Sequence, residues 1–175
     1  MHDFGILLVS ASEYKLISGA LGSSGMAKYW IFVSVPYTDF NTGSINDMLG
    51  RIESSEKWPI GKKTVHRKEL CKGDKVLFYQ GGEQGRKIVG TCDLCSGLVE
   101  DRDGMFDYVK VENFEFWKEP VDIKRVLRKL SFVKDPKRWG FNFKGGVVKI
   151  SEKDYRKILK YRCIRHGIDT RDPAN

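Results

Sequence analysis

Short segments rich in aromatic and β-branched residues recur along most of this 175-residue chain. Such runs, when Gly, Pro, Asn or Asp bound them, are typical of short β-strands. We expect strands at 29–35, 76–80, 87–94, 106–117 and 147–150, and a strand or extended loop at 139–143. Between Val111 and Phe114 the apolar positions change phase, which indicates a bulge in that strand. No strand–helix–strand rhythm is present, so a parallel sheet built from such units is not indicated.

Two or three short helices accompany these strands. Ser44-x-x-Asp47 and Ser151-x-x-Asp154 are capping boxes, and apolar residues at helical spacing follow each of them. Asp122 precedes a similar pattern at 123–130. The sequence therefore predicts an α+β, barrel-like domain of five to six strands with two to three flanking short helices.

The predicted domain spans residues 26–162. Residues 1–25 lack a comparable apolar pattern and are interpreted as a leader or extension, and 163–175 as a polar C-terminal tail. The longest uncharged run, 16–27, contains three Gly and three Ser. It is too short and too polar to span a bilayer, so we expect no membrane segment.

The four cysteines, Cys71, Cys92, Cys95 and Cys163, are scattered, which fits a reducing compartment and a cytoplasmic protein. Cys92-x-x-Cys95 is the single close pair, whereas a structural zinc site usually has two. Residues three apart in a strand also point to opposite faces. We therefore expect buried thiols, no metal and no cofactor, with a zinc or redox pair as the weaker alternative.

Positive charge is concentrated in two segments. The chain carries 31 Lys and Arg against 23 Asp and Glu, a net charge of +8. Segment 57–68 has five basic residues and no acid, and 124–138 has seven opposed by Asp135 alone. Such clusters are typical of nucleic-acid-binding proteins, although a solvated basic face explains the charge equally well.

Familiar catalytic motifs are absent. Gly61-Lys62-Lys63-Thr64 approaches a phosphate-binding loop, but Glu56 stands where the first Gly is needed and Lys63 displaces the hydroxyl. There is no dinucleotide-binding, nucleophile-elbow or His-Glu-x-x-His motif, and only three His are present. The sequence thus favours a binding protein over an enzyme.

Two tryptophans lie in or directly beside the basic segments. Trp58 is close to Lys57, Lys62 and Lys63, and Trp139 follows Lys137 and Arg138 directly. An aromatic ring that stacks on a base contributes about 1–3 kcal/mol, while nearby cations bind phosphates. The alternative for each is a core position flanked by lysines. Their Pro, Gly and Lys neighbours favour loops and function, whereas Trp30, within an apolar strand, is expected in the core.

Several segments, in their order along the chain, resemble EVE domains. Residues 29–36 (Tyr-Trp-Ile-Phe-Val-Ser-Val-Pro) are similar to the opening strand of that family. The resemblance continues through Trp58, Arg67-x-x-Leu70-x-x-Gly73-Asp74-x-Val76-Leu77-Phe78-Tyr79, Lys87-Ile88-Val89-Gly90, Leu130-Ser131-Phe132-Val133, Lys137-Arg138-Trp139, Phe143 and Ile150-Ser151-Glu152-Lys153-Asp154-Tyr155. It covers about residues 28–160 and is closest in pattern to archaeal stand-alone members.

This resemblance implies a PUA-like fold, a small open β-barrel related to the YTH readers of methylated adenine. Members of this superfamily hold a flipped, often modified base in an aromatic pocket beside a basic surface. The matching pocket positions are Ser34, Trp58, Tyr79 and Trp139. Candidate phosphate contacts are Lys62, Lys63, Arg67, Lys137 and Arg138. After Trp58 the chain reads Pro-Ile-Gly-Lys-Lys where many bacterial members have Gly-Val-Arg-Asn, which leaves the identity of the base open.

The leading hypothesis is therefore a non-enzymatic module that binds RNA or modified DNA through one base. The first alternative is a small amidohydrolase acting on modified nucleosides, like the related ASCH branch, for which Lys63, Thr64 and Glu69 are the nearest catalytic set. The second is a protein-interaction domain whose basic faces serve solubility.

Overall fold

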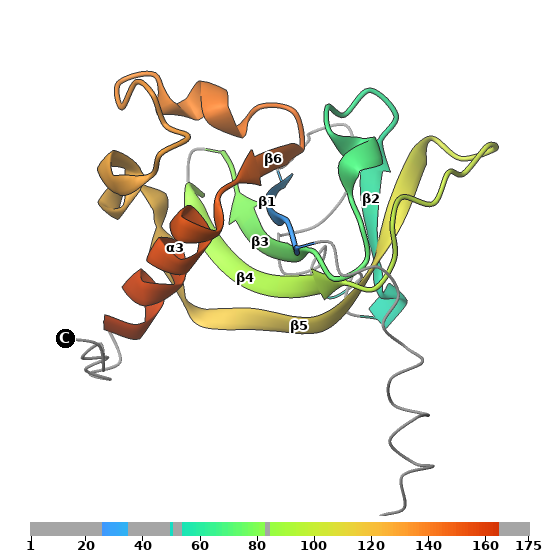
Figure 1. The fold of residues 1–175 in the computed structure, drawn as a ribbon, viewed down its shortest axis with the longest axis horizontal. Coiled ribbons are helices and arrows are strands. Elements are labelled where there is room, and N and C mark those ends of the chain that lie inside the picture. The colour runs from blue at the N-terminus through green and yellow to red at the C-terminus, as the bar shows by residue number, and fades with distance from the viewer. Residues whose placement is uncertain (1–25, 35–49, 51–53, 83–84, 165–175) are drawn as a thin grey trace, which may run out of the picture.

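The longest strand, β5 (Phe106–Asp122), organises the sheet because it pairs with two different strands along its length. Its first part pairs antiparallel with β2 (Lys57–Gly61). From Val111 onward it pairs antiparallel with β4 (Lys87–Leu94). β5 thus joins one edge of the sheet to its centre (Figure 1). The computed structural model describes residues 26–34, 50, 54–82 and 85–164.

The other strands continue from β4 to the opposite edge. β3 (Lys75–Gln80) pairs antiparallel with β4, β1 (Tyr29–Ser34) pairs parallel with β3, and β6 (Val147–Ile150) pairs antiparallel with β1. The resulting six-stranded order is β2-β5-β4-β3-β1-β6. β4 and β5 curve into an arc, so that β2 stands across from β1 and β3 in a partly open barrel (Figure 1).

A bulge in β5 contributes to this curvature. Thr91 pairs with Glu115 and Asp93 pairs with Glu112, so β5 has two residues opposite Cys92. One of them, Asn113, has a φ of 51°. The predicted bulge is confirmed, and it returns Phe114 to the face that carries Val109 and Val111.

Side chains on the two faces of the sheet form two separate cores, because successive strand residues point to opposite faces. The inner core lies inside the curled sheet and consists of Trp30, Phe32, Trp58, Ile60, Leu70, Val76, Phe78, Val89, Cys92, Leu94, Val109, Val111 and Val147. The outer core lies on the convex side and consists of Ile31, Leu77, Tyr79, Ile88, Trp117, Val121, Ile123, Val126, Leu127, Leu130, Val133, Phe143, Ile150 and Ile158.

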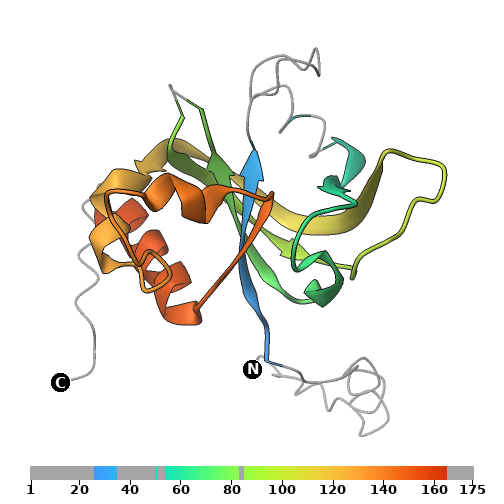
Figure 2. The same cartoon turned by 90° about the horizontal axis from the view of Figure 1, so that it is seen from above.

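Short helical elements cover the outer core (Figure 2). They are η2 (Ile123–Arg125), η3 (Leu127–Lys129), η4 (Trp139–Phe143) and α3 (Glu152–Ile164). One further 3-10 turn, η1 (Arg67–Glu69), precedes β3. The two predicted helix caps that lie within the described residues are confirmed. The Asp122 carboxylate accepts a hydrogen bond from the Lys124 amide at 2.9 Å, and Ser151 Oγ accepts one from the Asp154 amide at 3.1 Å.

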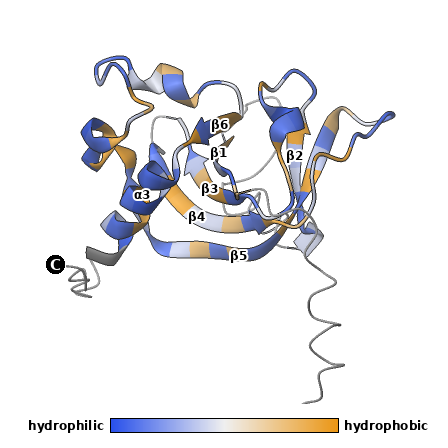
Figure 3. Ribbon diagram, in the orientation of Figure 1, coloured by the Kyte–Doolittle hydropathy of each residue, from blue (hydrophilic) through white to orange (hydrophobic). Residues whose placement is uncertain are grey.

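Hydropathy follows the same division. Figure 3 shows apolar positions along the strands, with hydrophilic residues along α3 and the surrounding turns. Among the residues that the structure describes, no helix is long and apolar enough to cross a membrane.

The structure confirms the α+β open-barrel expectation and corrects three local predictions. Segment 139–143 is a 3-10 helix, not a strand or extended loop. Segment 123–130 contains two 3-10 turns where one short helix is expected. Trp58 lies in edge strand β2, not in a loop. The leader 1–25, the Ser44–Asp47 capping box and most of the predicted tail lie outside the described residues.

Candidate functional site

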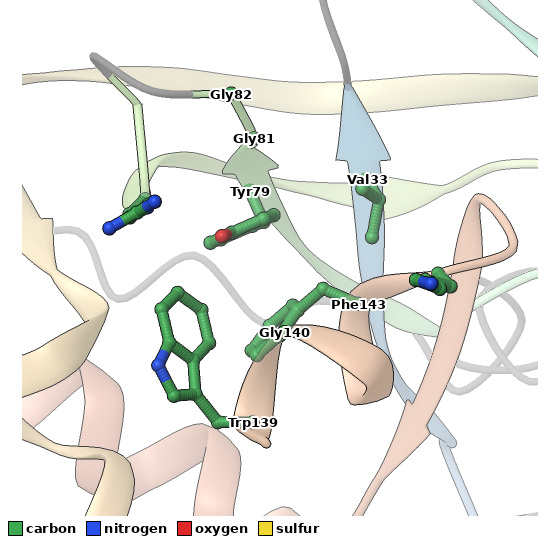
Figure 4. Close-up of a pocket in the computed structure, with 9 residues that line it drawn as sticks. Val33, Tyr79, Gly81, Gly82, Trp139, Gly140 and Phe143 are labelled. Carbon is green, nitrogen blue, oxygen red and sulfur yellow. The ribbon is translucent and has the colours of Figure 1, made fainter. Parts of the chain in front are cut away.

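A cavity of about 510 Å³ lies where the parallel strands β1 and β3 end and η4 crosses beside them (Figure 4). Its volume falls within the usual range for small-molecule sites. The lining consists of Val33, Tyr79, Gly81, Gly82, Arg86, Trp139, Gly140, Phe143 and Lys144. Parallel strands bring their carboxyl ends to the same edge of the sheet, which explains why Val33 and Tyr79 meet there.

Three aromatic rings form most of the apolar wall. Tyr79 and Phe143 stack with ring centroids 4.3 Å apart and an interplanar angle of 27°. Trp139 meets Phe143 edge-on, at 5.8 Å and 78°. Tyr79 and Phe143 are almost fully buried, whereas Trp139 is half-buried. The cavity thus offers flat apolar surfaces, and part of the Trp139 side chain is open to solvent.

Main-chain contacts hold the strand ends that carry these rings. The Gly81 amide donates to the Ser34 carbonyl at 2.7 Å and joins the end of β3 to the end of β1. The Val33 amide donates to the Gly146 carbonyl at 2.7 Å and joins β1 to the connection after η4. Gly146 has a φ of 82°, a conformation that favours glycine over other residues.

The described lining has two cations and no acid. Arg86 is exposed, and its guanidinium carbon lies 6.0 Å from the centroid of the Trp139 ring. Lys144 is also exposed, at the C-terminal cap of η4. Positive charge at an aromatic cavity suits a ligand that combines a planar ring with an anion.

Burial raises the pKa of Tyr79 to about 12, although Arg86 acts in the opposite direction. The Tyr79 hydroxyl therefore stays protonated at neutral pH and retains its ability to donate a hydrogen bond. The cavity thus keeps its positive character.

The four predicted pocket residues separate into two pairs. Tyr79 and Trp139 line the cavity together. Trp58 lies on the other face of the sheet, 5% exposed, with its ring stacked on Phe78 at 4.8 Å. Ser34 follows Val33 in β1 and so also points away from the cavity face. The structure does not bring all four into one pocket.

The predicted phosphate contacts also differ in their surroundings. Lys137 and Arg138 are exposed immediately before η4, beside the cavity. Lys62 and Lys63 are exposed in the turn after β2. That turn adjoins the connection after Lys144, since a Cβ on Gly146 would lie 3.5 Å from Thr64 Oγ1. Four of the five predicted cations therefore lie on exposed turns.

Arg67 is the exception. Its guanidinium is hydrogen-bonded to the carboxylate of Asp107, whose side chain is only 3% exposed. Arg67 itself is 19% exposed. Arg67 thus compensates a buried charge inside the fold.

Sequence reasoning missed Val33, Arg86, Phe143, Lys144 and the three lining glycines as cavity residues. Arg86 directly follows a Gly-rich turn between two correctly predicted strands, a position where side chains commonly serve binding. Lys144 directly follows the Trp-x-Phe-x-Phe run of residues 139–143. Nothing in the sequence around Arg86 or Lys144 indicates that these residues meet Tyr79 and Trp139 in the fold.

The amidohydrolase alternative needs Lys63, Thr64 and Glu69 to meet in one pocket. None of the described hydrogen bonds or ion pairs joins these three residues to one another. Glu69 accepts a hydrogen bond from Lys149 at 2.7 Å and lies 2.6 Å from His66 Nδ1. These contacts, with Lys149 the strongest, lower the pKa of Glu69 to about 2. Among the residues described, no group of three or more His, Cys, Asp or Glu could hold a metal ion.

Cys92 is buried in the inner core, and burial raises the pKa of its thiol well above the usual range. Cys95 is partly exposed. A buried, protonated thiol matches the structural role expected for Cys92.

Sequence comparison identifies relatives across most of the domain. The EVE domain family model matches residues 28–161. A UPF0310 protein of Pyrococcus horikoshii, PH1033, is 28% identical over 131 residues, which is 62% of this chain and 88% of that protein. A UPF0310 protein of Mycobacterium avium is 28% identical over 109 residues, or 56% of this chain and 76% of that protein.

Solved structures share the fold at low sequence identity. Rpa0253 from Rhodopseudomonas palustris has a TM-score of 0.55 at 18% identity, covering 79% of this chain and 94% of that one. Human THYN1, solved in complex with 5-methylcytosine-containing DNA, has a TM-score of 0.54 at 10% identity, covering 78% and 98%. With this sheet order and the family match across residues 28–161, the chain belongs to the EVE domain family and has its PUA-like fold.

Proposed function

We propose that this protein is a non-enzymatic nucleic-acid-binding module that accommodates one base, preferably a modified one, in the Tyr79–Trp139–Phe143 cavity. The observation that carries this proposal is the combination of three aromatic walls with two cations and no acid in the described lining. A nucleotide joins a planar apolar ring to an anionic phosphate, so it matches both features.

The base would stack on the half-buried Trp139 ring, with Tyr79 and Phe143 closing the apolar wall. The neutral Tyr79 hydroxyl would donate a hydrogen bond to a base edge.

The exposed cations would contact the phosphates. Arg86 and Lys144 would contact the phosphate next to the base, and Lys137 and Arg138 would contact phosphates further along the nucleic acid. Lys62 and Lys63 would extend this basic edge from the turn after β2.

A structural neighbour that was solved with a ligand supports this class of partner. Human THYN1, which shares this fold, was solved in complex with 5-methylcytosine-containing DNA. A protein of this architecture therefore binds methylated DNA. The cavity of this chain would accept a base of either RNA or modified DNA.

Binding of labelled oligonucleotides by fluorescence anisotropy tests the proposal. The panel holds single-stranded DNA and RNA pentanucleotides whose central base is 5-methylcytosine, N6-methyladenine or the unmodified counterpart. Trp139→Ala is expected to lose about 1–3 kcal/mol of binding, roughly 5- to 150-fold, while Trp139→Phe keeps part of it. Phe116→Ala, an exposed aromatic on β5, is the matched control. Equal affinity of wild type and Trp139→Ala, or no binding of any probe, contradicts the proposal.

The amidohydrolase alternative makes a different prediction. Under that reading Thr64→Ala and Glu69→Gln abolish release of acid from acylated nucleosides. Under our proposal both variants bind the probes as wild type does. Two results together would favour the amidohydrolase over our proposal. The wild type would release acid and both variants would not, and Trp139→Ala would bind oligonucleotides as wild type does.

A further inference from the structure

We infer that Phe141, together with Arg138 and Lys144, forms a second, exposed stacking site for a nucleotide that flanks the one in the cavity. This inference rests on the proposed function and extends it from one base to two. Phe141 is not among the residues that line the cavity, so a substitution of Phe141 can test the second site separately.

The exposure of Phe141 sets it apart within η4. Its side chain is 58% exposed, whereas Phe143 is 5% exposed. A 3-10 helix has three residues per turn, so residue 141 points away from the mean direction of residues 139 and 143. Phe141 thus contributes little to the outer core, and burial of its ring by a ligand removes apolar surface from water.

Two cations accompany this ring. Lys144 Nζ lies 4.1 Å from the ring centroid and the Arg138 guanidinium carbon lies 5.0 Å from it. Neither side chain forms an ion pair with an acid in the described part of the chain. Both are long and exposed, so they can move from the ring to phosphates when a base stacks on it.

The ring and the cavity are joined by Lys144 and Gly140. Lys144 lines the cavity and also lies over Phe141. Gly140 lines the cavity next to Phe141 in the chain, and a Cβ placed there would have no atom within 4 Å. A nucleic-acid chain that leaves the cavity across Gly140, where no side chain obstructs it, would meet Lys144 first and the Phe141 ring next.

The chemistry of the patch favours a nucleotide over a protein partner. Protein interfaces usually bury a cluster of apolar side chains within a polar rim. Phe141 is a single exposed large apolar residue on η4; the other described ones, Met26, Val65, Met105, Phe106 and Phe116, lie on other segments. One aromatic ring with two cations that form no ion pair within the described residues suits one base and its phosphates.

Abasic ligands provide a direct test. The probe is the pentanucleotide of the panel above that wild type binds most tightly, and two versions lack the base on the 5′ or the 3′ side of the central nucleotide. Phe141→Ala is expected to lower affinity for the intact probe by about 10-fold, within the range measured for single stacked bases. On one of the abasic versions, wild type and Phe141→Ala should bind equally, because the base that stacks is missing.

Matched variants separate the possible failures. Phe141→Trp should retain wild-type affinity and Phe141→Leu should not, since stacking needs an aromatic face. Phe116→Ala should bind all probes as wild type does. An unchanged affinity of Phe141→Ala, or an equal loss on all three probes, overturns the second site. If Trp139→Ala still weakens binding in that case, the proposed function stands; if no probe binds, both fail.

Discussion

Trp58 and Trp139 look alike in the sequence, yet they have opposite surroundings in the fold. Each stands among lysines or arginines, but Trp58 is packed between Phe32 and Phe78 in the inner core, and Trp139 borders a cavity. The first ring stabilises the barrel and the second is available to a ligand. Substitution of each residue should therefore affect a different measurement.

Trp58→Ala should lower the free energy of unfolding by about 3–5 kcal/mol, because it removes a large ring from a packed interior. Urea denaturation followed by far-ultraviolet circular dichroism measures this loss. Trp139→Ala should be destabilised much less, since its ring is half-buried. A similar loss in the two variants would show that Trp139 is also a core residue.

Arg67→Ala should act on stability and not on ligand binding. The substitution leaves the carboxylate of Asp107 buried without its cation, which costs about 3–5 kcal/mol for an interior ion pair. The double variant Arg67→Ala, Asp107→Asn should recover part of the loss. A shallower salt dependence of oligonucleotide binding in this double variant, which lacks the Arg67 charge, would instead support the predicted phosphate contact.

At the scale of elements, Asp154 joins α3 to the segment after η3. Its side chain is fully buried and accepts hydrogen bonds from the Ser131 amide at 3.0 and 3.1 Å. Burial alone would raise the pKa of this carboxyl, but its hydrogen bonds with Ser131, Lys157 and Ser151 lower it overall. The folded protein therefore prefers the ionised form.

Because the folded pKa of Asp154 lies below the unfolded one, its contribution to stability is complete above the unfolded value. That contribution is lost as pH falls through the folded value, below the ordinary 3.8. Asp154→Asn should be less stable near neutral pH by about 1.5–3 kcal/mol and should show a shallower loss in acid. Unfolding measured between neutral pH and about pH 2 tests both parts; parallel curves for the two proteins contradict the assignment.

Gly90 allows β4 and β5 to approach each other beside the bulge. A Cβ at this position would lie 2.4 Å from the Glu115 carbonyl oxygen. Gly90→Ala should therefore lower stability by about 1–3 kcal/mol through displacement of the β5 backbone. Gly140→Ala is the matched control, since its Cβ would meet nothing within 4 Å. Equal denaturation midpoints for the two variants would argue against a tight strand contact.

The elements differ in how far the sequence could predict them. β4 matches its predicted bounds, and the bulge lies where Val111 and Phe114 change phase, because both depend on neighbours in the chain. η4 was missed because Trp139, Phe141 and Phe143 alternate as strand residues do. β2 was missed because Pro59 is typical of loops, although an edge strand tolerates it.

The site was predictable only in part. Tyr79 and Trp139 were both identified, but their meeting depends on η4 crossing the end of β3, a contact between segments 60 residues apart. The separation of Trp58 from Tyr79 follows from the alternation of Phe78 and Tyr79 about the sheet, together with the curl that brings β2 across the inner face. Local patterns do not encode that curl.

At the scale of the whole molecule, the excess of positive charge should appear as salt dependence. The logarithm of the binding constant should fall linearly with the logarithm of salt concentration. Removal of one charge at Lys62, Lys63, Lys137 or Arg138 should reduce the slope by about 0.7–0.9. Lys118→Gln, on exposed β5, is a control that should leave the slope unchanged. A binding constant that does not respond to salt would remove the electrostatic part of the proposal.

The pairing of β1 between β3 and β6 also has a consequence for the order of events during synthesis. β1 is synthesised before both of its partners: β6 ends at Ile150, and the parallel pairing with β3 spans more than forty residues. Such non-local contacts form slowly. One edge of β1 therefore stays unpaired until β6 has been made, and the cavity cannot form before η4 has been made. A nascent or truncated chain that ends before η4 lacks Trp139, Phe143 and Lys144 of the cavity lining, so under the proposed function it cannot bind a base there.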